Sequence, residues 1–198
     1  MREDERQRKI KEAEKKIDEL GRVHKDIRRM SLCFEIARSS FDPSSKHGCV
    51  IYHQDGAILS GGYNGPPQGA VDLEIPTTRP EKYDYFEHSE RNAIYMAGRR
   101  GVALKDSIFY VTGFPCVECM RAIIQIGAFK LIYGPYNSVM TDSEAYLKKF
   151  TLLLKGQKLR VERFKYDKEL YEYTPRIKTL IENKKIADIR IENNFWKY

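Results

Sequence analysis

Two short motifs contain three side chains that bind transition metals well, those of His88, Cys116 and Cys119. The first motif also contains the carboxylate of Glu90. Cys116 and Cys119 are three residues apart, so both thiols would face one way from a helix N-terminus, where the helix dipole favours thiolate. One His and two Cys give zinc three ligands, and a catalytic zinc needs three because water takes the fourth position. Zinc lowers the pKa of that water to about 7, which supplies hydroxide at neutral pH. Glu90 is then a base that accepts a proton from the water.

Two other interpretations compete with a catalytic metal. A closed, structural zinc site would need a fourth ligand, for which Cys49 and His47 are the candidates. Structural sites usually draw their ligands from two close pairs, however, and they have no need of Glu90. A redox-active Cys-x-x-Cys dithiol would leave both His88 and Glu90 without a role. The combined pattern, His-x-Glu followed by Pro-Cys-x-x-Cys, is the known signature of zinc-dependent nucleobase deaminases, and it favours catalysis.

The surrounding hydrophobic pattern predicts an α/β domain that would position these motifs. Five strands are expected, at 48 to 53, 57 to 62, 107 to 112, 129 to 133 and 159 to 164. Helices are expected between them, at 88 to 100, 116 to 126 and 141 to 154, the last with Thr141 and Glu144 as a capping box. This order predicts a three-layer α/β/α fold with a mostly parallel sheet. Residues 63 to 87 are expected to be a long irregular loop, and such loops are usually functional.

Two extensions flank the predicted domain at 31 to 164. Residues 1 to 30 have the spacing of a charged amphipathic helix, which could continue into a first core helix ending near Ser39. Residues 165 to 198 form a tail that is expected to be partly helical after Pro175. The chain of 198 residues is thus expected to hold one domain with additions at both ends.

Composition narrows the class of protein. Hydrophobic residues make up 41% of the chain, enough for a globular core, but no apolar run approaches the roughly 18 residues of a membrane span. The first residues are densely charged and unlike a signal peptide, so a cytoplasmic location is expected, where four cysteines do not imply disulfides. Most of the net charge of +7 lies in the two extensions, interleaved with acids. Such mixed charge is typical of solvated helix faces rather than of nucleic-acid binding.

Over about residues 30 to 164, the chain resembles deoxycytidylate (dCMP) deaminases of the cytidine deaminase superfamily. The resemblance rests on the two zinc motifs and on further short matches: Asp42-Pro43-Ser44, Gly62-Tyr63-Asn64-Gly65, Asn92-Ala93-Ile94, Tyr110-Val111-Thr112 and Ile123-Ile124-Gln125. The Gly-Tyr-Asn-Gly loop favours dCMP deaminases over nucleoside or tRNA deaminases. The fold that this resemblance implies is the cytidine deaminase-like α/β/α fold.

The resemblance implies hydrolytic deamination of dCMP to dUMP, with dCTP as a second candidate substrate. Attack would occur at C4 of the pyrimidine with loss of ammonia, and Glu90 would protonate N3 and then the departing amine. Asn64 would hold the deoxyribose, and Tyr136 would close on the nucleotide. Ser89 stands where the family usually has Ala and would lie beside the base. For the 5′-phosphate, the candidate donors are Lys46, Ser45 and backbone amides near Pro43.

The resemblance also implies regulation by nucleotides. Tyr63, Asn64 and Gly65 belong to a loop that the family associates with an effector site at subunit contacts. Members are typically hexamers, activated by dCTP and inhibited by dTTP, with Mg²⁺ on the effector.

Two alternatives stay open: a deaminase acting on tRNA or single-stranded DNA through the basic extensions, and a zinc-stabilised binding module. Arg91, where the family usually has an apolar or neutral residue, is expected to be a solvent-facing helix charge.

Overall fold

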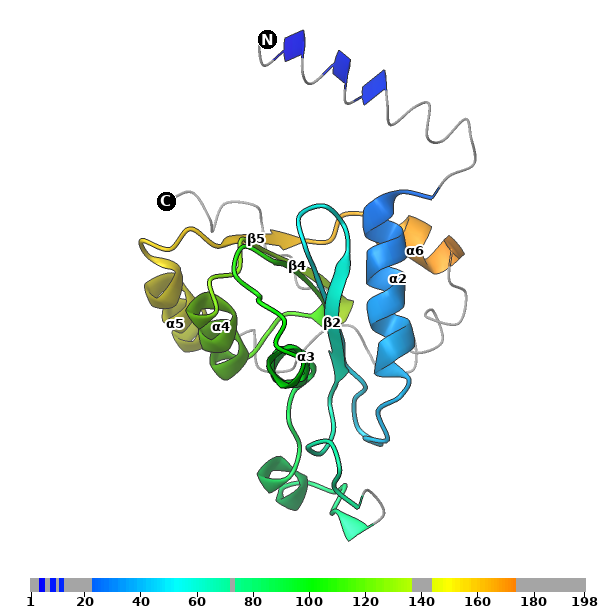
Figure 1. Cartoon of the computed structure of the whole chain (residues 1–198), viewed down its shortest axis with the longest axis vertical. Coiled ribbons are helices and arrows are strands. Elements are labelled where there is room, and N and C mark those ends of the chain that lie inside the picture. Colours follow the sequence, from blue (N-terminus) through cyan, green and yellow to red (C-terminus); the bar gives the residue numbers. More distant parts are fainter. Residues whose placement is uncertain are drawn as a thin grey trace.

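The computed structural model describes residues 4–5, 8–9, 11–12, 23–71, 74–136 and 144–173. A five-stranded sheet in the order β2-β1-β3-β4-β5 runs through its centre, with helices on both faces (Figure 1). The strands are β1 Gly48–Tyr52, β2 Ile58–Tyr63, β3 Ile108–Gly113, β4 Lys130–Tyr136 and β5 Arg160–Arg163. All five predicted strands are confirmed, and so is the three-layer α/β/α arrangement.

Only β1 runs against the other strands of the sheet. It pairs antiparallel with both of its neighbours, β2 and β3. The pairs β3 with β4 and β4 with β5 are parallel. Four strands therefore share one direction, which confirms a mostly parallel sheet and places the start of β1 beside the ends of β2 and β3.

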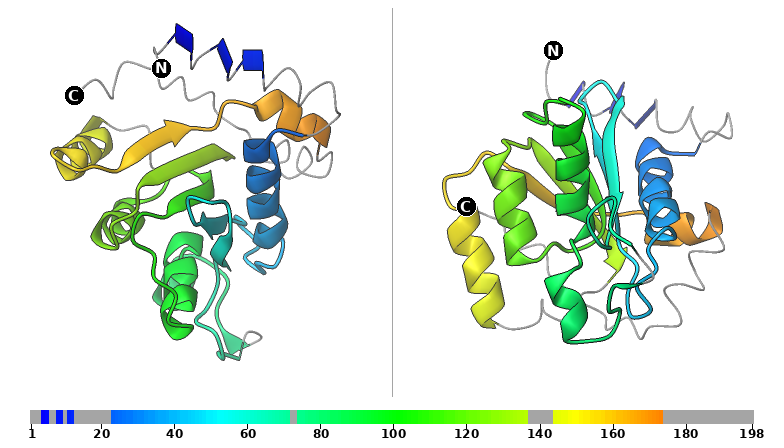
Figure 2. Two further views of the ribbon diagram at one scale, coloured as in Figure 1. Left: turned by 45° about the horizontal axis from the view of Figure 1, so that its top comes forward. Right: turned by 60° about the horizontal axis from the view of Figure 1, so that its bottom comes forward.

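The two faces of the sheet carry different helices and separate hydrophobic cores (Figure 2). On one face lie α2 Lys25–Ala37 and α6 Asp167–Tyr173, and on the other lie α3 Ser89–Arg99, α4 Val117–Gln125 and α5 Glu144–Leu154. Successive strand residues point to opposite faces. Val50 and Tyr52 therefore pack in the core beneath α2, while Cys49 and Ile51 pack in the core beneath α3 and α4.

The sequence prediction of a helix running from the N-terminus into the core was wrong at one point. Val23 and His24 are not helical, and α2 begins at Lys25. His24 is its N-cap, with φ −52° and ψ 140°, and its Nδ1 accepts the Asp26 backbone N–H at 3.2 Å. Histidine is not a usual capping residue, so the pattern alone did not reveal the break. Ile27, assigned by sequence to the extension, is buried in the core.

Both extensions lie largely outside the described residues. The described residues before 13 are helical, and two exposed ion pairs four residues apart, Arg8 with Glu12 and Lys9 with Glu5, agree with a solvated helix face. In the tail, α6 lies before Pro175, and Leu170 is fully buried; the helix predicted after Pro175 lies outside the described residues. The capping residue Thr141 and everything after 173 fall outside the described residues. No described helix has the length and apolar character needed to span a membrane.

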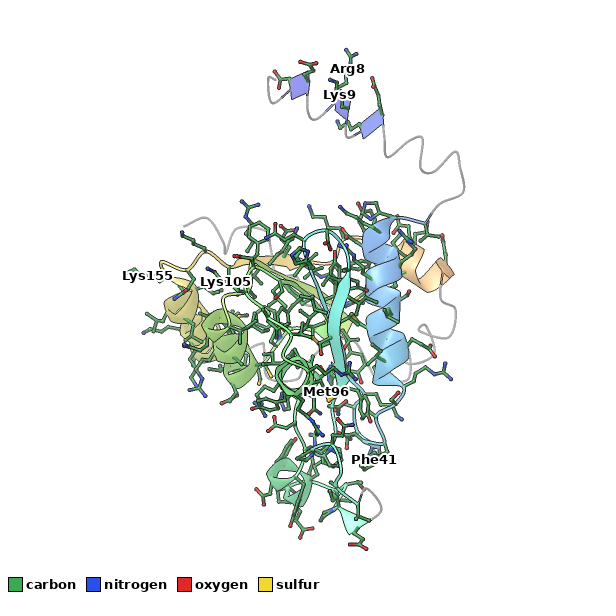
Figure 3. All side chains as sticks on the ribbon, in the orientation of Figure 1. Arg8, Lys9, Phe41, Met96, Lys105 and Lys155 are labelled. Carbon is green, nitrogen blue, oxygen red and sulfur yellow. The ribbon has the colours of Figure 1, made fainter. Side chains whose placement is uncertain are left out.

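The long segment between β2 and α3 projects from the body of the molecule (Figure 1). Its described residues are mostly irregular, as predicted, apart from one short 3₁₀ helix, η2 Glu81–Asp84. Phe41, labelled in Figure 3, lies where this segment joins the body. Its ring meets that of Phe86 edge to face, with centroids 5.5 Å apart.

Candidate active site

The three predicted metal ligands lie together. Within the described part of the chain, His88, Cys116 and Cys119 form the one group whose ligand atoms could hold a metal ion, all within 4.8 Å of one another. The His88 Nδ1 atom is 3.3 Å from Cys116 Sγ and 3.6 Å from Cys119 Sγ. Ideal tetrahedral zinc, with bonds of about 2.1 Å to nitrogen and 2.3 Å to sulfur, separates such ligands by about 3.6 Å. The group therefore fits zinc. Cys49 and His47, the candidate fourth ligands of a closed site, are not part of the group.

Two helix N-termini bring these ligands to the same place. His88 is the N-cap of α3, and Cys116 is the N-cap of α4, each with an extended backbone. Cys119 lies in the first turn of α4, where its backbone N–H points to Cys116 Sγ at 3.5 Å. The free N–H groups and the positive end of each helix dipole favour negative sulfur here. The Cys-x-x-Cys spacing thus places both sulfurs at the N-terminus of α4, as the sequence indicated.

Electrostatics also favour a cation among these ligands. A hydrogen bond from the Cys119 thiol, with help from His88, lowers the pKa of Cys116, while the pKa of Cys119 is raised. The hydrogen bond to Cys116 in turn raises the pKa of His88. A divalent ion bound here would hold both sulfurs as thiolates.

Glu90 lies buried beside the ligand group. It is 5% exposed, in the first turn of α3, and it interacts electrostatically with His88 and Cys116. Burial raises the pKa of its carboxyl, and the nearby positive charge on His88 opposes that effect. Ser89 is fully buried, and its hydroxyl donates to Glu90 Oε2 at 3.0 Å. The predicted substrate contact Ser89 thus orients the Glu90 carboxylate.

The predicted substrate contact Asn64 is deeply engaged with its own protein. It is 7% exposed. Its Nδ2 donates to Asp42 Oδ2 at 3.1 Å and to the Ser45 carbonyl at 2.8 Å. Its Oδ1 accepts the His47 backbone N–H at 2.7 Å. Both amide hydrogens are used, so only acceptor capacity on Oδ1 is left for a nucleotide.

Tyr136, the other predicted contact, ends β4 near this loop. Its ring packs edge to face against His47, with centroids 4.5 Å apart, and the Lys46 backbone N–H donates toward its hydroxyl. Gly113 pairs with it across the sheet, and a Cβ on Gly113 would lie 2.3 Å from the Tyr136 carbonyl oxygen. A glycine at 113 is therefore needed to bring Tyr136 so close to β3.

The groups predicted to bind the 5′-phosphate already have partners. The backbone N–H groups of Ser44 and Ser45 both donate to Asp42 Oδ1, at 2.7 and 3.2 Å. The Lys46 ammonium donates to the Ser40 carbonyl. In this conformation, these donors shape the loop before β1 rather than presenting themselves to a ligand.

The Gly-Tyr-Asn-Gly loop is bound directly to the helix that carries His88. Gly65 exchanges two backbone hydrogen bonds with Glu87, at 3.0 and 2.8 Å, and Asn92 Nδ2 donates to the Tyr63 carbonyl at 2.9 Å. A Cβ on Gly62 would lie 2.5 Å from the Ala93 nitrogen, so only glycine allows this contact. Of the three predicted effector contacts, Tyr63 is 38% exposed, while Asn64 and Gly65 are buried.

Arg91 is not the solvent-facing charge that the sequence predicted. Its side chain is 22% exposed, and its Nε donates to Glu87 Oε2 at 2.5 Å. The i, i+4 spacing of Glu87 and Arg91 could have indicated this pair. Sequence reasoning also missed a buried ion pair between Lys82 and Asp42. No local signal links these two residues, because 40 positions separate them.

Comparison with known proteins agrees with this geometry. The profile of the family described as cytidine and deoxycytidylate deaminase zinc-binding region matches residues 23–135. The chain belongs to the cytidine and deoxycytidylate deaminase family. The match covers the predicted metal ligands, Glu90 and the Gly-Tyr-Asn-Gly loop.

Relatives of this deaminase-family chain include two animal proteins. It is 36% identical to human deoxycytidylate deaminase over 110 residues, 52% of this chain and 61% of the human protein. It is also 36% identical to a probable deoxycytidylate deaminase of Caenorhabditis elegans over 160 residues, 69% of this chain and 80% of that protein. The chain thus spans less than two thirds of the human relative.

A solved structure shows the same fold for the family domain. The dCMP deaminase of cyanophage S-TIM5, crystallised with dCMP and dUMP, matches with a TM-score of 0.55 and 25% identity. The match covers 72% of this chain and 99% of the phage protein. The cytidine deaminase-like fold expected from the sequence is therefore confirmed.

Proposed function

We propose that this protein hydrolyses dCMP to dUMP and ammonia, with zinc held by His88, Cys116 and Cys119. The observation that carries the proposal is a three-ligand group with the spacing of a tetrahedral zinc site and the buried carboxylate of Glu90 beside it. A binding module has no need of that carboxylate. The named relatives, and the phage structure with dCMP and dUMP, support the choice of substrate.

Zinc at this site would lower the pKa of a water molecule and so supply a nucleophile at neutral pH. The chain's own contribution is proton transfer. Glu90 accepts one proton of that water and donates it to N3 of the pyrimidine as the C4–O bond forms. It then takes the second proton from the hydroxyl on C4 and delivers it to the amine, which leaves as ammonia when the C4–N bond breaks. Burial favours this exchange, because it raises the pKa of the Glu90 carboxyl toward the working pH. A carboxyl with such a pKa both accepts and releases a proton more readily. The Ser89 hydroxyl holds one carboxylate oxygen in place throughout.

Two residues at the ends of strands β2 and β4 would hold the substrate. Asn64 keeps an acceptor on Oδ1 that suits a sugar hydroxyl, and the Tyr136 ring, already packed on His47, would cover the nucleotide. Both groups belong to buried, well-connected parts of the protein, so they would be in place before the substrate arrives.

The test of this function is ammonia release from dCMP and from deoxycytidine, which have the same base and sugar. The zinc-loaded protein is expected to deaminate dCMP with a kcat/KM at least roughly 10-fold higher, because one hydrogen bond to a charged group contributes about 1.5–3 kcal/mol. Parallel reactions with dCTP and single-stranded DNA define the range of substrates. Equal kcat/KM values for dCMP and deoxycytidine would contradict a monophosphate site, and faster turnover of single-stranded DNA would support a polynucleotide deaminase.

We further propose that dCTP activates and dTTP inhibits the enzyme, each with Mg²⁺, through the loop of Tyr63, Asn64 and Gly65 in a cytoplasmic hexamer. The domain at 31 to 164 is filled by the catalytic fold, so regulation would act between subunits. The contacts of Gly65 with Glu87 and of Asn92 with Tyr63 give the loop a direct connection to the metal-binding helix.

Regulation predicts sigmoidal dCMP kinetics that dCTP makes hyperbolic and dTTP suppresses. A coupling free energy of about 1–3 kcal/mol would shift apparent substrate affinity roughly 5- to 150-fold. The measurements are rate curves at fixed effector and the mass in solution. A variant lacking residues 1 to 22, which ends before the core helix α2, shows whether the N-terminal segment adds to assembly. A monomer with hyperbolic kinetics, unaffected by either effector, would contradict the proposal.

A further inference from the structure

One buried ion pair connects the projecting segment to the loop before β1. Lys82 Nζ lies 2.9 Å from Asp42 Oδ1 and 2.7 Å from Oδ2, and the two side chains are 3% and 4% exposed. Lysine is almost never so deeply buried without a partner. Removing two charges from water costs as much as their attraction returns, so such a pair is weak evidence for a purely stabilising role. What else the carboxylate binds is therefore informative.

Asp42 is the centre of a network that ends at the substrate site. Its Oδ1 accepts the backbone N–H groups of Ser44 and Ser45, and its Oδ2 accepts Asn64 Nδ2. Burial alone would raise the pKa of Asp42, but the hydrogen bond and charge of Lys82, with the two amides, lower it overall. Lys82 thus keeps Asp42 ionised and able only to accept hydrogen bonds.

The network fixes which way the Asn64 amide faces. An ionised carboxylate can only accept a hydrogen bond, so Nδ2 must point to Asp42. The His47 backbone N–H can only donate, so Oδ1 must point to it. A flipped amide would set oxygen against oxygen and N–H against N–H. With Lys82 absent, Asp42 could take up a proton or move, and its contact with Asn64 Nδ2 would be lost. The Ser45 carbonyl, which also accepts from Nδ2, and the His47 N–H would still favour the same orientation, but the amide would be held less firmly.

We propose that Lys82 is a positioning residue of the substrate site, which acts through Asp42 to hold the Asn64 amide in the orientation that presents Oδ1 to a sugar hydroxyl. This inference rests on the proposed function. Lys82 itself touches no part of the metal group, since its ammonium lies against Asp42 and near the rings of Tyr83 and Phe86.

The test is the kinetics of zinc-loaded Lys82→Met with dCMP. The KM for dCMP is expected to rise at least ~10-fold, the equivalent of one lost hydrogen bond, while kcat and zinc content stay within about 3-fold of the wild type. Lys82→Arg keeps the charge and is expected to restore most of the affinity. The matched control is Tyr110→Phe, which breaks a partly buried hydrogen bond to Asp26 on the face of the sheet that α2 covers. It is expected to lower the melting temperature without changing KM.

A double-mutant cycle separates positioning from general loosening of the fold. If Lys82 acts through Asn64, Lys82→Met will change kcat/KM little further in an Asn64→Ala background. Effects of the two substitutions that simply multiply would overturn the inference. Should Lys82→Met not fold, the neutral pair Lys82→Gln with Asp42→Asn keeps similar volumes without the charges. This pair is expected to fold and to show the same rise in KM.

The remaining outcomes distinguish this inference from the function on which it rests. A wild-type protein that loads zinc but neither binds nor deaminates dCMP overturns both. A wild-type protein that deaminates dCMP, together with folded Lys82 variants whose KM is unchanged, overturns the positioning role alone.

Discussion

Alanine in place of Cys116 is expected to leave the protein with almost no bound zinc and no measurable release of ammonia from dCMP. Cys116 is the sulfur closest to His88 Nδ1 and the N-cap of α4. Losing a hydrogen-bond partner of a metal ligand already costs roughly 10- to 100-fold in metal affinity or activity, so losing the ligand itself costs more. Elemental analysis of the purified protein would measure the metal, at about one zinc per wild-type chain.

Cys33→Ala is the matched control for this experiment. Cys33 is fully buried on the inner side of α2, where burial raises the pKa of its thiol and its Sγ donates to the Tyr110 carbonyl at 3.2 Å. This variant removes one thiol from the other face of the sheet and is expected to keep its zinc. Full zinc occupancy in Cys116→Ala would remove the basis for the proposed chemistry.

Replacing Glu90 with Gln is expected to lower kcat at least ~10²-fold while zinc and fold are retained. Glutamine keeps the size of the side chain and can still meet the Ser89 hydroxyl, but it cannot accept and return a proton. Proton transfer by a positioned side chain typically contributes 10²–10⁴-fold, which sets the lower limit. Steady-state ammonia release, zinc analysis and circular dichroism on the same sample would test all three parts.

Glu118→Gln makes the same chemical change elsewhere in the metal motif. Glu118 lies in the first turn of α4 between the two cysteines, but its side chain is exposed. Its replacement is expected to change kcat less than about 3-fold. Wild-type turnover by Glu90→Gln would show that another group carries the proton.

Features set by short-range patterns could be predicted from the sequence. The three metal ligands and Glu90 are specified by spacings of two and three residues at helix N-termini, so their grouping followed once the elements were placed. The strands were found because a buried strand of β-branched and aromatic residues, such as β1, is locally distinctive. Turn and glycine signals then gave the hairpin and the helix ends.

Features that depend on long-range contacts could not be predicted. The partnership of Lys82 with Asp42 exists only because η2 folds back against the loop before β1. The amides of Ser44 and Ser45, for which the sequence had indicated a phosphate, are instead used in a short-range contact with the Asp42 carboxylate, two and three residues earlier. The end of helical structure at His24 could not be predicted because the amphipathic spacing continues across it.

The reversed direction of β1 has a practical consequence for modifying this protein. Gly48 at the start of β1 pairs with Tyr63 at the end of β2. The loop that enters β1 and the loop that leaves β2 therefore lie at the same end of the strands. The hairpin turn at 53–57 consequently lies at the other end of these strands, and its residues are mostly exposed. Exposed turns tolerate inserted sequence well. A fluorescent label or an affinity tag placed there would lie at the opposite end of the strands from the group of His88, Cys116 and Cys119.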